Sequence, residues 1–252
     1  MAKYACYFGS AALILAGIAA GTAVCEVPGQ ERGRDVENLI NVSFGDQIMI
    51  ARGDAQLDTP EKVQRSIKSW QEDNDGQTIL WRMSSIYMKR FYERRQSGGF
   101  AIEYLNKVAE IEKLFDPPVL ARQQATANGQ QFLLYLTVFD HGAPLTDLYG
   151  GDTPCPFQDR YTIEHPEVQA VDREGNYHNG VLDMAHPQAR KLMVDRIAAF
   201  VEELDADGAY ICTRTHSLPA LHADQFGFGK PIVQAYQKRY GINILEDPRF
   251  DY

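Results

Sequence analysis

Cysteine is scarce in this chain of 252 residues, and apolar runs long enough to span a bilayer are missing. The four cysteines show no Cys-x-x-Cys spacing, so the pattern favours neither a zinc site nor a dense disulfide framework. No stretch after the first two dozen residues is apolar enough for a membrane-spanning helix, which needs about 20 residues. We therefore expect no metal, no cofactor and no transmembrane helix in the mature chain.

Positive charge is in deficit. The chain has 25 Lys and Arg against 34 Asp and Glu, a net charge of −9. This balance repels phosphate backbones and anionic membrane surfaces, so we expect no nucleic-acid partner. With 44% hydrophobic and 23% charged residues, the composition is that of an ordinary globular protein.

Three catalytic patterns are also missing. The sequence has no glycine-rich dinucleotide motif, no serine nucleophile elbow and no His-Glu-x-x-His helix. Each supplies a specific chemistry: phosphate binding, acyl transfer and zinc-assisted hydrolysis. Redox, esterase and zinc-protease functions therefore have no local support.

The N-terminus is typical of an export signal. Lys3 supplies a positive charge, and the apolar residues 11–20 that follow are too few to span a bilayer. Gly21 and Ala23 place small residues where a signal peptidase requires them. We expect a signal peptide over residues 1–23 and a secreted or periplasmic protein.

Lipid attachment at Cys25 is the alternative, although Val24 is larger than the residue that normally precedes a lipidated cysteine. A polar linker is expected over residues 24–37, before a folded domain over 38–252. Export also permits a disulfide between Cys155 and Cys212. Free buried thiols are the simpler interpretation.

Short apolar runs then alternate with segments of helical spacing. Strands are expected over 39–44, with 47–50 close behind it, 78–83, 132–139 and 209–213. Helices are expected from the capping signal at 58–61, and over 100–114, from 187 to about 204, and 230–240. Residues 140–186 are expected to form a long functional loop.

Four strand–helix units in sequence predict a right-handed parallel α/β sheet. A full (β/α)₈ barrel takes about 250 residues for eight units, so we expect a TIM-barrel-like fold with only the N-terminal four or so units present. The chain would then be the first part of a longer barrel protein, or a truncated product. Such a sheet has two unpaired edges and an uncovered face.

A set of short motifs carries a family resemblance, over roughly residues 130 to 245. These are Gly180–Pro187, Ala189-Arg190, Asp207-Gly208, Tyr149–Gly151, Pro154–Arg160, Arg214–Ser217, Gln225–Phe228 and Arg239–Gly241. Together they resemble the glycosyl-hydrolase-like barrels of the GHL10 type, a family-10-like group of secreted bacterial proteins. The resemblance implies a TIM-like barrel, a carbohydrate ligand and chemistry at the carboxyl ends of the strands.

One position departs from this resemblance. Barrels of this type often place an acidic residue where Cys212 stands, at the end of the fourth strand. Glycoside hydrolysis needs two carboxyl groups, about 5–5.5 Å apart for retention or about 6.5–9.5 Å apart for inversion. A thiol replaces neither, so hydrolysis would depend on other residues.

The candidate catalytic residues are Asp140 and His141, which follow the third strand where barrel active sites are built. Asp140 could equally cap the loop that follows it. Arg82, Arg214 and His216 are candidate sugar-binding residues, because they end strands and carry several hydrogen-bonding groups. Ion pairs are the alternative for the arginines, with Asp140 for Arg82 and with an acid of a neighbouring loop for Arg214.

Tyr149 and Asp183 complete the candidate substrate-binding set. A tyrosine ring can stack on a sugar, although aromatic residues in long loops also pin the loop to the body. Asp183 fits a structural anchor as well as a ligand contact. The hypothesis is a secreted glycoside-hydrolase-like protein that cleaves glycosidic bonds in a polysaccharide or oligosaccharide by acid/base catalysis. A non-catalytic carbohydrate-binding barrel and an inactive fragment are the alternatives.

Overall fold

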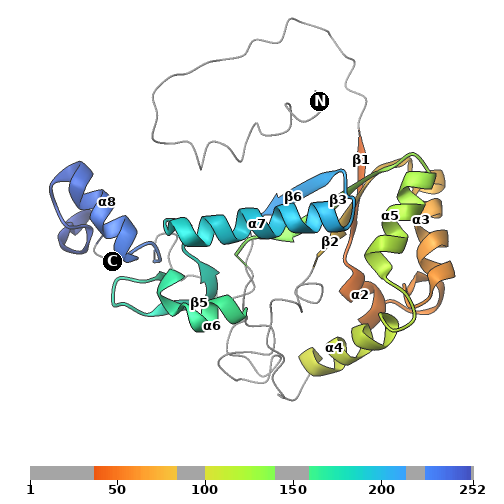
Figure 1. The fold of residues 1–252 in the computed structure, drawn as a ribbon, viewed down its shortest axis with the longest axis horizontal. Coiled ribbons are helices and arrows are strands. Elements are labelled where there is room, and N and C mark those ends of the chain that lie inside the picture. The colour runs from red at the N-terminus through yellow and green to blue at the C-terminus, as the bar shows by residue number, and fades with distance from the viewer. Residues whose placement is uncertain (1–36, 84–99, 140–158, 214–224, 251–252) are drawn as a thin grey trace, which may run out of the picture. The chain divides into compact units, whose positions relative to one another are not determined.

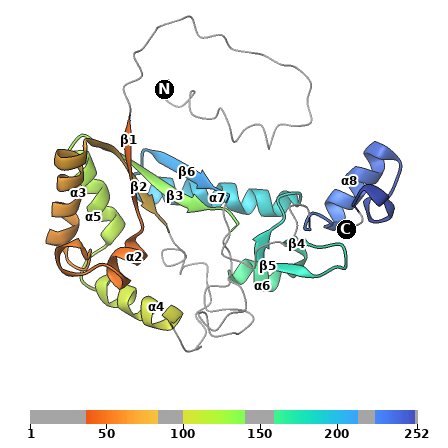
Figure 2. The same cartoon turned by 180° about the vertical axis from the view of Figure 1, so that it is seen from behind.

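The structure, a computed structural model, describes residues 37–83, 100–139, 159–213 and 225–250 (Figure 1). Its main sheet has four parallel strands in the spatial order β1-β2-β3-β6. These strands are β1 (Asn38–Val42), β2 (Gly76–Arg82), β3 (Gln131–Thr137) and β6 (Gly208–Cys212). A second, antiparallel pair joins β4 (Gln169–Val171) to β5 (Tyr177–Leu182), and Figure 2 shows it from behind.

Helices connect the strands of the main sheet. The α-helices are α2 (Phe44–Met49), α3 (Pro60–Asn74), α4 (Phe100–Ile111), α5 (Pro117–Ala127), α6 (Arg160–Glu164), α7 (Pro187–Glu203) and α8 (Lys230–Tyr240). Single 3₁₀ turns lie at η1 (Gly53–Ala55), η4 (Pro166–Val168), η5 (Ile244–Glu246) and η6 (Pro248–Phe250).

The strand order confirms the expected fold class. Each strand of the main sheet pairs with the next one in the chain, without a reversal. A doubly wound sheet reverses its order at a switch point, whereas a (β/α) barrel adds its strands one after another around the ring. The described residues therefore form an α/β fold with a four-stranded parallel sheet and alternating helices, as in part of a TIM barrel.

Local chemistry sets the ends of α3. The Thr59 side chain accepts a hydrogen bond from the Lys62 backbone N–H, and Pro60 occupies the first turn, where its missing N–H costs nothing. The helix ends at Asp75, which is left-handed with φ 49°. Gly76 follows because a Cβ there would lie 2.8 Å from both the Ile40 side chain and the Trp70 carbonyl.

One face of the main sheet packs against the helices, and we call it the helix face. Its side chains alternate along the strands and join one core with residues of α3, α5 and α7. At its centre the Trp81 ring lies 5.7 Å from the Phe44 ring and 6.2 Å from the Phe132 ring, centroid to centroid. All three rings are almost completely buried. Burial of such a side chain stabilises the fold by about 1.5–3 kcal/mol.

The alternate residues of the same strands form the opposite face. They are Leu39, Asn41, Thr78, Leu80, Arg82, Gln131, Leu133, Tyr135, Thr137, Gly208, Tyr210 and Cys212. This face mixes apolar, aromatic and polar groups. Tyr210 is 46% exposed, and so in part is Ile211 on the helix face of β6, at 37%. The helix-face residues of β3 are buried.

Two sequence-based expectations were wrong. Residues 47–50 do not extend a strand: α2 contains most of them, because Phe44 and Ile48 are both buried at the i, i+4 spacing of a helix. Residues 159–186 are not a loop, since they contain α6, η4, β4 and β5. Gly175, with φ 90°, turns the chain between β4 and β5.

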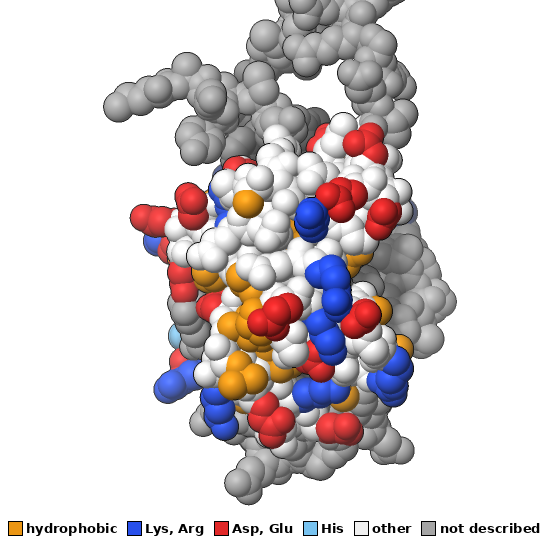
Figure 3. Space-filling model, turned by 90° about the vertical axis from the view of Figure 1, so that its right-hand side faces the viewer, with side chains coloured by type: hydrophobic (Ala, Val, Ile, Leu, Met, Phe, Trp, Pro, Cys, Tyr) orange, Lys and Arg blue, Asp and Glu red, His pale blue; other side chains and the backbone are white. Residues whose placement is uncertain are grey.

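The outer surface of α3 and α5 carries both signs of charge, interspersed (Figure 3). Its ion pairs include Lys62–Asp58 at 2.7 Å and Lys68–Glu72 at 3.6 Å, each spaced i, i+4 on or next to α3. The Lys68–Glu72 pair is exposed and contributes little to stability. The surface is that of a solvated helix layer.

Candidate functional site

Three side chains form a row across the opposite face. The register pairs Arg82 of β2 with Tyr135 of β3, and Tyr135 with Tyr210 of β6. Directly paired residues of parallel strands point to the same side of the sheet, so the three groups are neighbours. Arg82 is the last residue of β2, which places the row toward the carboxyl ends of the strands, where barrel enzymes build their sites.

The two tyrosine rings are stacked. Their centroids lie 5.1 Å apart and their planes differ by 18°, within the range of favourable offset stacking. The Arg82 guanidinium carbon lies 5.9 Å from the Tyr135 ring centroid, a cation–π distance. We call Arg82, Tyr135 and Tyr210 the aromatic platform.

The Arg82 guanidinium is incompletely satisfied. Its Nε is buried and has no hydrogen-bond partner among the described residues. A polar group that loses water without gaining a partner costs free energy. The platform therefore contains a cation with unused donor capacity.

The strands themselves supply no acidic side chain to this end of the sheet. None of the four strands of the main sheet contains Asp or Glu. Thr137 and Cys212 pair two residues beyond the two tyrosines, on the same face of the sheet. Cys212 is a half-buried free thiol. Cys155 lies outside the described residues. The described strand ends thus offer hydrogen bonding and stacking rather than a carboxylate pair.

Most of the candidate site residues lie outside the described residues. These are Asp140, His141, Tyr149, Arg214 and His216. The chain turns after β3, and Val138 donates its N–H to the Cys212 carbonyl. This segment is described as far as Phe139. Asp140 follows immediately in the sequence.

Asp183 is among the described residues, and its hydrogen bond and ion pair are with residues near α7 rather than with the platform. Its side chain is buried, and Oδ1 accepts a hydrogen bond from the Ala185 N–H. Oδ2 lies 3.8 Å from Nε2 of His186, which directly precedes α7. A Cβ at Gly229 would collide with Oδ2, so the chain before α8 passes close to this carboxylate. No hydrogen bond or ion pair joins Asp183 to Arg82 in the described part.

A buried ion pair escaped the sequence analysis. Arg196 on α7 donates two hydrogen bonds to the Asp159 carboxylate, and both side chains are buried. Asp159 also caps α6 by accepting from the Tyr161 N–H. Burial raises the pKa of Tyr161, and Glu167 adds to this effect. A sequence signal did exist: Arg196 interrupts the apolar side of α7 between Met193 and Phe200.

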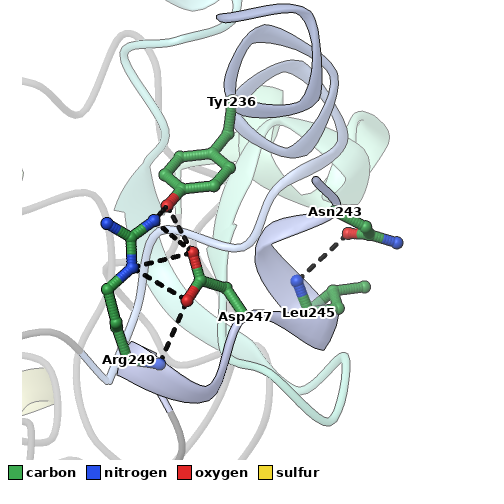
Figure 4. A network of polar contacts seen from close by, with 5 residues as sticks. All are labelled: Tyr236, Asn243, Leu245, Asp247 and Arg249. Atoms are coloured by element: carbon green, nitrogen blue, oxygen red, sulfur yellow. Dashed lines mark hydrogen bonds and ion pairs between the residues drawn. The ribbon is translucent and has the colours of Figure 1, made fainter. Parts of the chain in front are cut away.

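A polar network closes the C-terminal segment (Figure 4). The Asp247 carboxylate accepts hydrogen bonds from the Arg249 side chain and, at 2.6 Å, from the Tyr236 hydroxyl. These donors hold the pKa of Asp247 well below its usual range, Arg249 contributing most. The bond to Asp247 also raises the pKa of Tyr236. Arg173, in the turn between β4 and β5, donates to the Leu245 and Phe250 carbonyls.

These contacts have a structural role, because they join the C-terminal segment to α8 and to the turn between β4 and β5. The backbone of β4 adds to it, since the Val171 carbonyl accepts from the Gly227 and Phe228 N–H groups. Within the described ranges no three His, Cys, Asp or Glu side chains gather in a way that could hold a metal ion. Nor does any described helix have the length and apolarity needed to cross a bilayer.

Comparisons with known proteins leave the family open. No protein-family model matches this sequence, and neither does any curated protein. A solved structure with some similarity is a noncanonic maltogenic alpha-amylase, AmyB, from Thermotoga neapolitana. The TM-score is 0.43 at 12% identity, over 81% of this chain and 43% of the amylase chain. This chain thus spans less than half of the amylase's length, and a likeness at this level assigns no activity.

Proposed function

We propose that this chain binds carbohydrate on the aromatic platform. The observation that carries the proposal is the stacked Tyr135–Tyr210 pair with Arg82 beside it, on the sheet face that does not pack against the helices. A pyranose ring has an apolar face that stacks on a flat aromatic ring, and hydroxyl groups that accept from guanidinium N–H donors. Tyr210 is 46% exposed, so its ring is accessible.

Hydrolysis of the bound sugar is the second candidate function. Asp140 and His141 follow β3 directly and would supply an acid or base there, with Tyr149, Asp183, Arg214 and His216 as further sugar contacts. The strands themselves favour recognition over hydrolysis. They contain no carboxylate, and Cys212 ends β6, whereas the reaction requires two carboxyl groups. Export through residues 1–23 would bring the protein to extracellular or periplasmic polysaccharides.

Glycan binding by the full chain tests the proposal. The variant is Tyr210→Ala, and the matched control is Tyr177→Ala, since Tyr177 on β5 is also 46% exposed. We expect wild type and the control to bind the same glycans, while Tyr210→Ala loses about tenfold in affinity, or about 1.4 kcal/mol. A wild-type chain that binds no glycan, or equal losses in both variants, would overturn the proposal.

A reducing-sugar assay separates the two functions. Release of reducing ends that disappears in Asp140→Asn would establish hydrolysis and the part of Asp140 in it. Binding without release, retained in Asp140→Asn, would establish a recognition protein.

A further inference from the structure

We infer that the sugar recognised at the aromatic platform is acidic: a hexuronate whose carboxylate pairs with Arg82. This inference rests on the proposed carbohydrate-binding function and narrows it to one substrate class.

Arg82 differs from the other arginines that the structure buries or half-buries. Each of those donates to an oxygen of the protein. Arg122 and Arg196 donate to aspartate carboxylates, and Arg173 and Arg190 donate to backbone carbonyls. Arg82, which is also half-buried, has an aromatic ring beside it and a buried Nε without a hydrogen-bond partner in the described part. The protein thus places a partly desolvated cation where the described structure offers it no anion.

The strands around Arg82 cannot supply that anion. The four strands contain no Asp or Glu, and the neighbouring positions of the row are tyrosines. A desolvated charge is costly unless it is paired. A ligand carboxylate would complete the pairing, whereas a neutral sugar would leave the charge uncompensated.

The guanidinium also suits a carboxylate in shape. Its planar fork of N–H donors binds two oxygens at once, and contact with an aromatic face does not use up those donors. A hexuronate combines what the platform offers on one ring, since it has an apolar face for Tyr210 and a carboxylate for Arg82. The net charge of −9 opposes anions at long range, so selectivity has to come from this local contact.

Calorimetry with matched ligands tests the inference. The ligands are trisaccharides of galacturonate, glucuronate and mannuronate, each beside its neutral hexose counterpart, titrated into the full chain at neutral pH. We expect at least one uronate to bind tenfold or more tightly than its counterpart, and added salt to reduce this preference. Methyl esterification of that uronate should abolish the preference on the unaltered protein.

Variants then locate the contact. Arg82→Gln should remove the preference for the uronate, because it lowers binding of the uronate much more than binding of the neutral sugar: the Gln amide can still donate to a hydroxyl but cannot pair with a carboxylate as a cation does. Arg239→Gln is the matched control, because Arg239 also lies over a tyrosine ring, at 5.3 Å from the Tyr240 centroid, and should change nothing. If Arg82→Gln does not fold, the methyl ester decides alone.

The failures are distinguishable. Neutral sugars that bind as tightly as every uronate would overturn this inference and leave the proposed function standing. An absence of binding to all six ligands and to the glycan panel would overturn both.

Discussion

The two faces of the main sheet are built from the same strands and differ most clearly along β3, where Leu134 and Leu136 are buried while Leu133 and Tyr135 are half-buried. On the helix face Trp81, Phe132 and Leu134 are completely buried. On the opposite face Tyr210 is half exposed, and Arg82 has a donor without a partner in the described part. Period-two alternation places these sets on opposite sides of the same backbone.

The difference separates stability from recognition. Close packing makes the helix face intolerant of lost volume, so it fixes the backbone on which the platform stands. The opposite face carries groups that folding leaves incompletely satisfied, and such groups gain most from a ligand. The same strands therefore act as a rigid scaffold on one side and as a binding surface on the other.

Adjacent leucines of β3 test this separation most directly. Leu134 is completely buried on the helix face, and Leu133 is half-buried on the opposite face. Leu134→Ala should lower the free energy of unfolding by about 3–4 kcal/mol, because it leaves a cavity in a packed core. Leu133→Ala should cost about 1 kcal/mol, since less area leaves contact with the protein. Urea unfolding measures both, and equal losses would contradict the difference between the faces.

Cys212 provides a reporter on the opposite face. It lies two residues beyond Tyr210 on the same strand and side, and its thiol is free. A sugar on the platform should slow alkylation of Cys212 several-fold at saturation. The rate is read as the difference between wild type and Cys212→Ser, which removes the contribution of the other cysteines. Unchanged alkylation at saturating sugar would place the ligand elsewhere.

The sequence predicted the helix face better than the platform. All four strands of the main sheet were expected within one or two residues of their observed starts, because buried parallel strands read as apolar runs. The start of α3 followed from Thr59 and Pro60, and the end of α8 from Gly241, which is left-handed with φ 74°. These features depend on a few consecutive residues.

The platform depends on register, which no local pattern encodes. Arg82 was expected at a strand end, but its pairing with Tyr135 and Tyr210 joins residues far apart in the chain. Asp207 directly precedes β6. Its carboxylate accepts from the Phe132 N–H and from Arg122, so it also ties β6 to β3. The β4–β5 hairpin was missed because β4 has only three residues and β5 mixes polar with apolar residues. Gly175 is the residue that could have indicated the turn between them.

The effect of acid is expected outside the main sheet, in the polar network of the C-terminal segment. The pKa of Asp247 is lowered by Arg249 and Tyr236. The network therefore stabilises the C-terminal segment above the unfolded carboxyl pKa of about 3.9 and loses this contribution as the pH falls below it. The protection of α8 against hydrogen exchange, taken relative to the intrinsic exchange rate at each pH, should fall between about pH 4 and pH 2. In Asp247→Asn this protection should already be low at about pH 6. Exposed Asp195→Asn is the control, and an identical acid response in both variants would contradict the prediction.

The smallest effect is expected on the solvent side of α7, the helix that packs Phe200 and Leu204 against the helix face. There Lys191 pairs with Asp195 at 2.7 Å, with both side chains more than half exposed. Water screens this attraction, and ordering two long side chains offsets part of it. Lys191→Ala should therefore change the free energy of unfolding by no more than about 0.5 kcal/mol. A loss of about 2 kcal/mol in the same urea experiment would mean that this side of α7 is covered in solution. The helix would then be packed on both sides, and its outer side would no longer count as a solvated surface.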